Sequence, residues 1–221
     1  MTLAVKFGRF TEDMTQQSTT RASATEPDTT EPDTRALYAR TLDQTATVID
    51  AVRPDQLDLP TPCPEWDVRT LLSHIVGVVR RTAILGEGGD ALSVSAFVEG
   101  VVADHGWPAA YRAATDRTLA AWADDAKLGK PVTVPWGVVP GAVALGGYVR
   151  EILAHGWDLA MATGQPTELD PDLAEFALEI SLRSLTPEMR ADERVPFGAV
   201  VPADPSAGPY ARLAAWRGRQ P

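Results

Sequence analysis

One stretch of the sequence spaces a carboxylate and an imidazole by one helical turn. The stretch is YVREILAHGWDLAMATGQ, residues 148–165, in which Glu151 and His155 are four positions apart. Side chains at this spacing lie on one face of a helix, with Cβ atoms about 5–6 Å apart. Such a pair can form a hydrogen bond or ligate one metal ion, so its role depends on whether that face points inward.

The apolar residues around the pair indicate that it faces at least partly inward. A helix is predicted over about residues 141–162, and its core-facing stripe follows steps of three and four residues. The stripe consists of Leu145, Tyr148, Ile152, His155 and Leu159. Glu151 flanks it, and Asp158 follows on the same side. A carboxylate inside a protein must be paired or bound to a metal, because burying it bare is very costly.

A second histidine has a similar place on another predicted helix. This helix covers about residues 68–85, with Asp67 as its N-cap, and His74 lies at the edge of its apolar stripe. His74, Glu151 and His155 could therefore converge between two helices, which is how bundle cores build metal sites. Two imidazoles, one carboxylate and a free position make an open, catalytic type of divalent site. A closed structural zinc site usually takes four protein ligands, including cysteines.

The residues alone leave simpler interpretations open. A lone histidine on an apolar stripe is more often a hydrogen-bonded core residue, and EILAH differs from the HExxH helix of metalloproteases. Cys63, between two prolines, is interpreted as a packed residue rather than a reactive thiol or an extra ligand. His105 is interpreted as a loop residue rather than part of a pocket mouth. Three tryptophans are expected to brace the bundle rather than bind an aromatic substrate: Trp66, Trp136 and Trp157.

The composition argues against several classes of function. The net charge of −10 argues against a nucleic-acid partner, which needs a basic face, and against an anionic membrane surface. The apolar runs are far shorter than the roughly 20 residues of a membrane span, and the N-terminus lacks the pattern of a signal peptide. The single cysteine excludes an internal disulfide. We therefore expect a cytoplasmic protein.

The chain divides into a polar tail and a helical domain. Residues 1–34 are predicted to be a disordered tail, because the part from residue 11 is rich in Thr, Glu and Asp and almost free of apolar residues. Helical patterns recur from residue 35 onward, with a short β-leaning segment near Trp136 and a Pro- and Gly-rich C-terminal extension that holds one last short helix. Four or five helices with few strands predict an all-α bundle over residues 35–221.

Two stretches carry a family resemblance. PTPCPEWDVRTLLSHIVG (residues 60–77) and YVREILAHGWDLAMATGQP (residues 148–166) together resemble the signature stretches of the mycothiol-dependent maleylpyruvate isomerase family, within the DinB-like superfamily. In that family a Pro-Cys-Pro-x-Trp-x-Val turn leads into a helix ending in Leu-x-x-His, and a later helix carries Glu-x-x-x-His-x-x-Asp. The C-terminal VPFGAVVPADPSAGPYARLAAWRGRQP is similar to the ending of a smaller helical branch of the family.

The resemblance implies a DinB-like four-helix bundle and a divalent metal, with zinc as the first expectation. It implies His74, Glu151 and His155 as ligands, and Asp158 as the residue that orients a ligand from behind. It also implies mycothiol, or another low-molecular-weight thiol, as cofactor, because a metal-bound thiol loses its proton.

The function implied is a thiol-dependent isomerase or transferase that acts on a small electrophile, with no individual catalytic residue assigned. The isomerase has an additional C-terminal domain that contributes to its active site, and this chain is too short after its fifth predicted helix to hold that domain. Maleylpyruvate is therefore not the expected substrate. The alternatives are a metal-binding module without catalysis and a plain helical interaction module.

Overall fold

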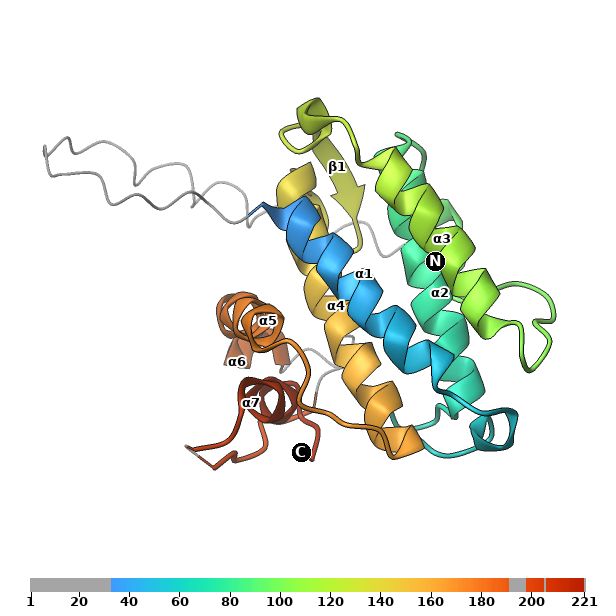
Figure 1. Ribbon diagram of the computed structural model, residues 1–221. Coiled ribbons are helices and arrows are strands. Elements are labelled where there is room, and N and C mark those ends of the chain that lie inside the picture. Colours follow the sequence, from blue (N-terminus) through green and yellow to red (C-terminus); the bar gives the residue numbers. More distant parts are fainter. Residues whose placement is uncertain (1–32, 191–197, 205, 221) are drawn as a thin grey trace, which may run out of the picture.

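Four long helices lie side by side and form the body of the protein (Figure 1). The computed structural model describes residues 33–190, 198–204 and 206–220. The bundle helices are α1 (Thr34–Asp50), α2 (Val68–Gly86), α3 (Trp107–Ala121) and α4 (Gly141–Thr163). The predicted all-α bundle is confirmed. Residues 1–32 of the predicted disordered tail lie outside the described residues, and α1 begins at the last position assigned to that tail.

Local capping chemistry sets the ends of these helices. Asp33 caps α1, and the predicted N-cap of α2, Asp67, accepts a 2.7 Å hydrogen bond from the backbone N–H of Thr70. Helix α4 ends at Thr163 and is capped by Gly164, whose φ of 68° is the left-handed conformation that glycine adopts readily. Helix α3 ends at Ala121, earlier than the predicted end near Asp125, where a single 3₁₀ turn follows instead.

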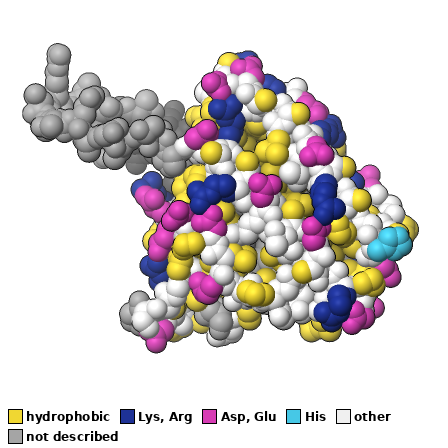
Figure 2. Space-filling view, viewed as in Figure 1, with side chains coloured by type: hydrophobic (Ala, Val, Ile, Leu, Met, Phe, Trp, Pro, Cys, Tyr) yellow, Lys and Arg dark blue, Asp and Glu magenta, His cyan; other side chains and the backbone are white. Residues whose placement is uncertain are grey.

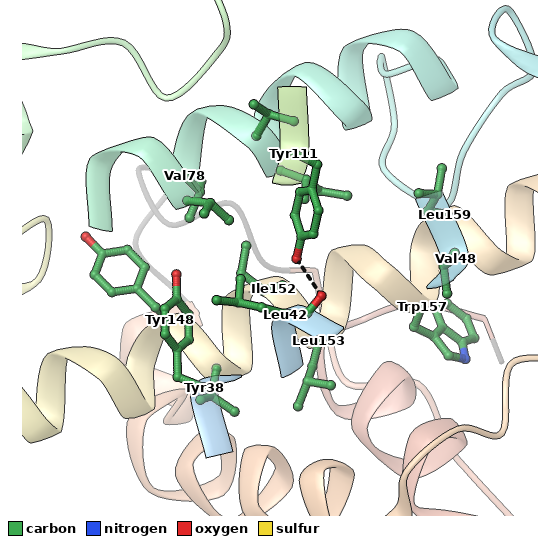
Figure 3. Close-up of a cluster of buried hydrophobic side chains, with 14 of the residues drawn as sticks. Tyr38, Leu42, Val48, Val78, Tyr111, Tyr148, Ile152, Leu153, Trp157 and Leu159 are labelled. Atoms are coloured by element: carbon green, nitrogen blue, oxygen red, sulfur yellow. Dashed lines mark hydrogen bonds between the residues drawn. The ribbon is translucent and has the colours of Figure 1, made fainter. Parts of the chain in front are cut away.

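The core lies between α1, α2, α3 and α4. Helix α1 packs on α4, and α2 packs on α3. The largest fully buried side chains include Tyr38, Leu42, Ile49, Leu71, Ile75, Tyr111, Ile152 and Leu153. Figure 3 shows part of this cluster, in which the Tyr111 hydroxyl donates a 3.0 Å hydrogen bond to the backbone carbonyl of Leu42. The ring of Tyr111 is therefore buried while its hydroxyl keeps a hydrogen-bond partner.

Helix α4 is the central element, because other elements pack on several of its sides. It contacts α1 and α2 within the bundle, and it also contacts α5 (Pro171–Ser184) and α7 (Pro209–Trp216). Figure 1 shows α5 and α7 beside α4, on the side away from α2 and α3. Residues all around α4 are consequently buried, including Gly156, Trp157 and Asp158, which lie off the predicted stripe.

The smaller elements connect the helices. The β-leaning segment forms an antiparallel hairpin of β1 (Pro131–Val134) and β2 (Gly137–Pro140), with Val132 opposite Val139. Single 3₁₀ turns lie at η1 (Pro54–Gln56), η2 (Ala91–Ser93) and η3 (Asp125–Lys127). The last predicted short helix is α7, whereas the one-turn helix α6 (Pro187–Arg190) was not predicted. Within the described residues, no helix has the length and apolarity needed to cross a membrane.

The surface mixes charges of both signs. On the face shown in Figure 2, Lys and Arg side chains are interspersed with Asp and Glu side chains and with hydrophobic ones. The described part of this face therefore has no continuous basic patch of the kind that a nucleic-acid backbone needs.

Candidate metal centre

Helices α2 and α4 bring the three predicted ligands together. The Oε1 atom of Glu151 lies 3.4 Å from Nε2 of His74 and 3.2 Å from Nε2 of His155. One ligand atom from each residue lies within 4.8 Å of the other two. Residues 77 positions apart in the sequence thus point their polar atoms at one small volume.

The spacing of these atoms fits a divalent ion. Zinc lies about 2.0–2.2 Å from imidazole nitrogens and carboxylate oxygens, so neighbouring ligand atoms in a tetrahedral shell are about 3.3–3.5 Å apart. The two contacts of Glu151, at 3.2 and 3.4 Å, have close to this length. Three protein ligands leave a fourth position, and the Glu151 side chain is 26% exposed, so the cluster has an open side.

Asp158 contacts His155 from behind. Its Oδ2 atom lies 3.1 Å from Nδ1 of His155, and its side chain is 0% exposed. A carboxylate at this place accepts a hydrogen bond from the Nδ1–H group, which leaves Nε2 directed at Glu151. The contact places Asp158 where it could orient His155, and this role stays a prediction.

The electrostatics of the cluster keep both carboxylates charged. Burial opposes the charged form of each group, yet the neighbouring carboxylate of Glu151 raises the pKa of His155 well above its usual value, with help from Asp158. The His155 charge in turn lowers the pKa of Glu151 well below its usual value. Contacts with His155 and Arg219 outweigh burial and lower the pKa of Asp158 to about 2. Without a metal, a charged imidazole therefore bridges the two carboxylates.

His74 is in a different electrostatic situation. Burial has the largest effect on the pKa of His74 and lowers it, although the neighbouring Glu151 acts to raise it. A neutral imidazole is the form that ligates a metal. The pair of histidines thus combines one imidazole that is already neutral with one whose Nε2 proton a divalent ion would displace.

Aromatic rings cover one side of the imidazoles. The ring centroid of Trp66 lies 4.7 Å from that of His74 and 5.7 Å from that of His155, and Phe97 lies 5.1 Å from His74. Trp66 comes from the tight loop before α2, in which Glu65 has an uncommon φ of 73°. Trp66 therefore packs directly on the candidate ligands, in addition to the bracing role expected from the sequence.

Cys63 lies behind the same centre. It is 8% exposed, and its sulfur lies 3.1 Å from Asp158 Oδ2 and 3.7 Å from His155 Nδ1. Cys63, His155 and Asp158 form a second group of possible metal ligands. The guanidinium of Arg219 lies 3.3 Å from the sulfur and donates to both oxygens of Asp158, so a cation already engages these ligand atoms of the second group, whereas Oε1 of Glu151 in the first group faces the two histidines. The group of His74, Glu151 and His155 is the one better arranged for an ion.

Sequence reasoning missed two arginines at the site. Arg217 is 2% exposed and places Nη2 3.3 Å from Glu151 Oε2, while Arg219 places Nε 2.5 Å from Asp158 Oδ1. Both follow α7 in the segment WRGRQ, where their spacing carries no signal of a site more than 60 residues earlier in the chain.

His105 belongs to a separate surface feature. It lines a groove of about 200 Å³ together with Asp50, Asp104 and Trp107. None of the residues that line this groove belongs to the candidate metal centre.

Comparison with known proteins places the chain in a family. The sequence model of the family described as mycothiol maleylpyruvate isomerase N-terminal domain matches residues 38–160, a range that contains the three candidate ligands and Asp158. Two uncharacterised proteins of Mycobacterium tuberculosis, from strains CDC 1551 / Oshkosh and H37Rv, are each 34% identical over 182 residues. These alignments cover 82% of this chain and 95% of each relative. No solved structure matches the chain. The chain belongs to the mycothiol maleylpyruvate isomerase N-terminal domain family.

Proposed function

We propose that the protein is a metal-dependent enzyme that uses a low-molecular-weight thiol, of the mycothiol type, to isomerise or modify a small electrophile. His74, Glu151 and His155 are its proposed metal ligands, and zinc is the proposed ion. The observation that carries the proposal is the convergence of these three residues at distances of 3.2 and 3.4 Å, beside an open side of the cluster. The family to which the chain belongs supports the thiol as cofactor.

A divalent ion bound here would act as a Lewis acid and hold a thiol in its reactive, deprotonated form. The chain's own residues prepare the site. Asp158 orients His155 through Nδ1, the neutral His74 offers Nε2, and Glu151 supplies one oxygen. The rings of Trp66 and Phe97 shield one side from water. Isomerisation and thiol transfer both remain within the proposal, because both begin with the same activated sulfur.

A metal-binding module without catalysis is the second candidate. It is favoured by how deeply the two histidines are buried, at 9% and 5% exposure, so that Glu151 is the most exposed of the three. The cavity behind the centre, lined by Trp157, Tyr210 and Arg219 among others, has a volume of only about 10 Å³, which is room for about one water. A substrate would therefore have to approach from the Glu151 side.

Metal content distinguishes both candidates from a plain interaction domain. We would measure it by mass spectrometry on full-length protein purified without a histidine tag. The expected result is about one divalent ion per chain in the wild type, lost in His74→Ala, Glu151→Ala and His155→Ala. The chain has three histidines, so His105→Ala is a matched control that should keep the ion. A wild type that is metal-free and takes up no added zinc, nickel or manganese would refute the proposal.

Catalysis needs a second measurement. The metal-loaded protein would be incubated with a thiol and a panel of small electrophiles, and the consumption of thiol or the isomerisation of the electrophile would be followed. A rate above background that disappears in Glu151→Ala supports the enzyme. Metal binding without any such rate across the panel supports the module.

A further inference from the structure

The C-terminal segment, residues 209–220, reaches the candidate metal centre from outside the region that the family model matches, which ends at residue 160. Helix α7 packs on α5, and the chain then turns at Gly218, whose φ is 83°. The backbone N–H groups of Gly218 and Arg219 donate 3.0 Å hydrogen bonds to the carbonyls of Ala215 and Ala214. This left-handed turn, which favours glycine, fixes the backbone beside two arginines that point at α4.

Arg219 holds Asp158 with two hydrogen bonds. Its Nε donates to Oδ1 at 2.5 Å and its Nη2 donates to Oδ2 at 2.7 Å, in the two-pronged geometry that only arginine provides. The Oδ2 atom is also the one that faces Nδ1 of His155 at 3.1 Å. A continuous chain of contacts therefore runs from Arg219 through Asp158 to the imidazole, and ends at Glu151.

Arg217 contacts the centre at a different ligand. Its Nη2 lies 3.3 Å from Oε2 of Glu151, whereas Oε1 of the same carboxylate faces both histidines. One oxygen of Glu151 is thus engaged by the C-terminal segment and the other remains directed at the proposed ion. The segment therefore contacts one proposed ligand, Glu151, directly, and a second, His155, through Asp158.

We propose that the C-terminal segment is part of the metal centre, with Arg219 as a positioning residue that acts through Asp158 on His155. The proposal rests on the proposed function, because it assumes that His155 binds a metal. Two guanidinium–carboxylate hydrogen bonds fix the plane of the Asp158 carboxylate. That plane fixes the direction of the hydrogen bond to Nδ1, and so the direction in which Nε2 is presented. Arg217 has the corresponding role for Glu151.

The test compares metal binding in full-length variants. Arg219→Met removes the charge and both hydrogen bonds, and Arg219→Lys keeps the charge but not the two-pronged geometry. The matched control is Arg212→Met, because Arg212 joins α7 to Glu175 of α5 and does not touch the centre. The readouts are the visible absorption spectrum of bound Co²⁺, which reports ligand geometry, and the Kd for Co²⁺ from competition with a chelator.

The expected result is a Kd raised about tenfold in Arg219→Met, with a changed Co²⁺ spectrum, since residues that orient ligands are worth about 10–100-fold in affinity. Arg219→Lys should recover part of the affinity, and Arg212→Met should match the wild type in both readouts. A wild-type spectrum and Kd in both Arg219 variants would overturn the inference while leaving the proposed function intact. A wild type that binds no Co²⁺ would instead overturn the proposed function and this inference with it.

A double-mutant comparison checks the route of the effect. If Arg219 acts through Asp158, adding Arg219→Met to Asp158→Asn should raise the Kd little beyond Asp158→Asn alone, because the two changes break one chain of contacts. Fully additive effects would contradict the proposed route, and they would assign Arg219 an action on the centre that is independent of Asp158.

Discussion

Among the residues that the structure describes, Asp158 is the most deeply buried charged side chain, and neutralising it should be costly. Its side chain is 0% exposed and accepts hydrogen bonds from Arg219, from the thiol of Cys63 and from His155. Asp158→Asn keeps the shape of the side chain but replaces the carboxylate with an amide. Arg219, whose side chain is 11% exposed, then loses the anionic partner of its guanidinium group inside the protein.

The expected loss of stability follows from the burial of this pair. Removing one partner of a buried ion pair typically costs about 3–5 kcal/mol, because the remaining charge is left uncompensated. Small domains are stable by about 5–15 kcal/mol, so the variant should still fold. With a urea m-value of about 2–3 kcal/mol per molar, the midpoint should fall by about 1–2.5 M.

Urea denaturation of the metal-free protein, followed by circular dichroism, measures this loss. The control is Asp50→Asn, because Asp50 also pairs with an arginine, Arg112, at 2.5 Å, but with 43% of its side chain exposed. An exposed pair contributes about 0–1 kcal/mol, so this midpoint should hardly move. An Asp158→Asn midpoint that falls no further than that of Asp50→Asn would contradict the cost assigned to the buried pair.

Two further predictions concern packing and capping. Gly147→Ala should destabilise the protein by about 1–3 kcal/mol, because the added Cβ would lie 2.5 Å from the ring of Trp136. Gly129→Ala is its control, since nothing lies within 4 Å of the added atom there, and equal thermal midpoints for the two variants would contradict the prediction. Asp67→Ala should lower the free energy of unfolding by about 1 kcal/mol, because it removes the 2.7 Å hydrogen bond that caps the Thr70 N–H group. Asp67→Asn should keep most of this stabilisation, because its side-chain oxygen can accept the same hydrogen bond. Thermal denaturation measures the stability of all these variants. An Asp67→Asn variant as unstable as Asp67→Ala would show that the lost capping hydrogen bond does not explain the loss of stability.

The sequence allowed the prediction of those parts of the site that are local in the chain. Glu151, His155 and Asp158 lie within two turns of one helix, so helical periodicity alone indicated that they share a side of the helix that faces at least partly inward. Asp67 was predictable for the same reason, because a helix cap depends on the next three residues. Such features need no knowledge of tertiary packing.

The convergence of distant residues required more than periodicity. The arrival of His74 beside Glu151 depends on how α2 packs against α4. The helical stripes made this convergence possible, and the family resemblance favoured it over the simpler interpretations. Arg217 and Arg219 lie in a short Pro- and Gly-rich segment, where no hydrophobic period indicates a direction. Their approach to α4 depends on the docking of α7 and on the turn at Gly218, which are tertiary features.

The charge balance of the centre connects the C-terminal segment to the proposed chemistry. The carboxylates of Glu151 and Asp158 are matched by the guanidinium groups of Arg217 and Arg219, which contact them directly. Suppose that a divalent ion displaces the extra proton of His155. The two positive charges of the ion are then unbalanced within these four groups, because both carboxylates are already matched by the arginines. Uncompensated charge in a low-dielectric site is costly, so an anion in the fourth position is favoured. A thiolate is such an anion, so if the proposed metal binds here, the two arginines would favour a deprotonated sulfur over a neutral ligand.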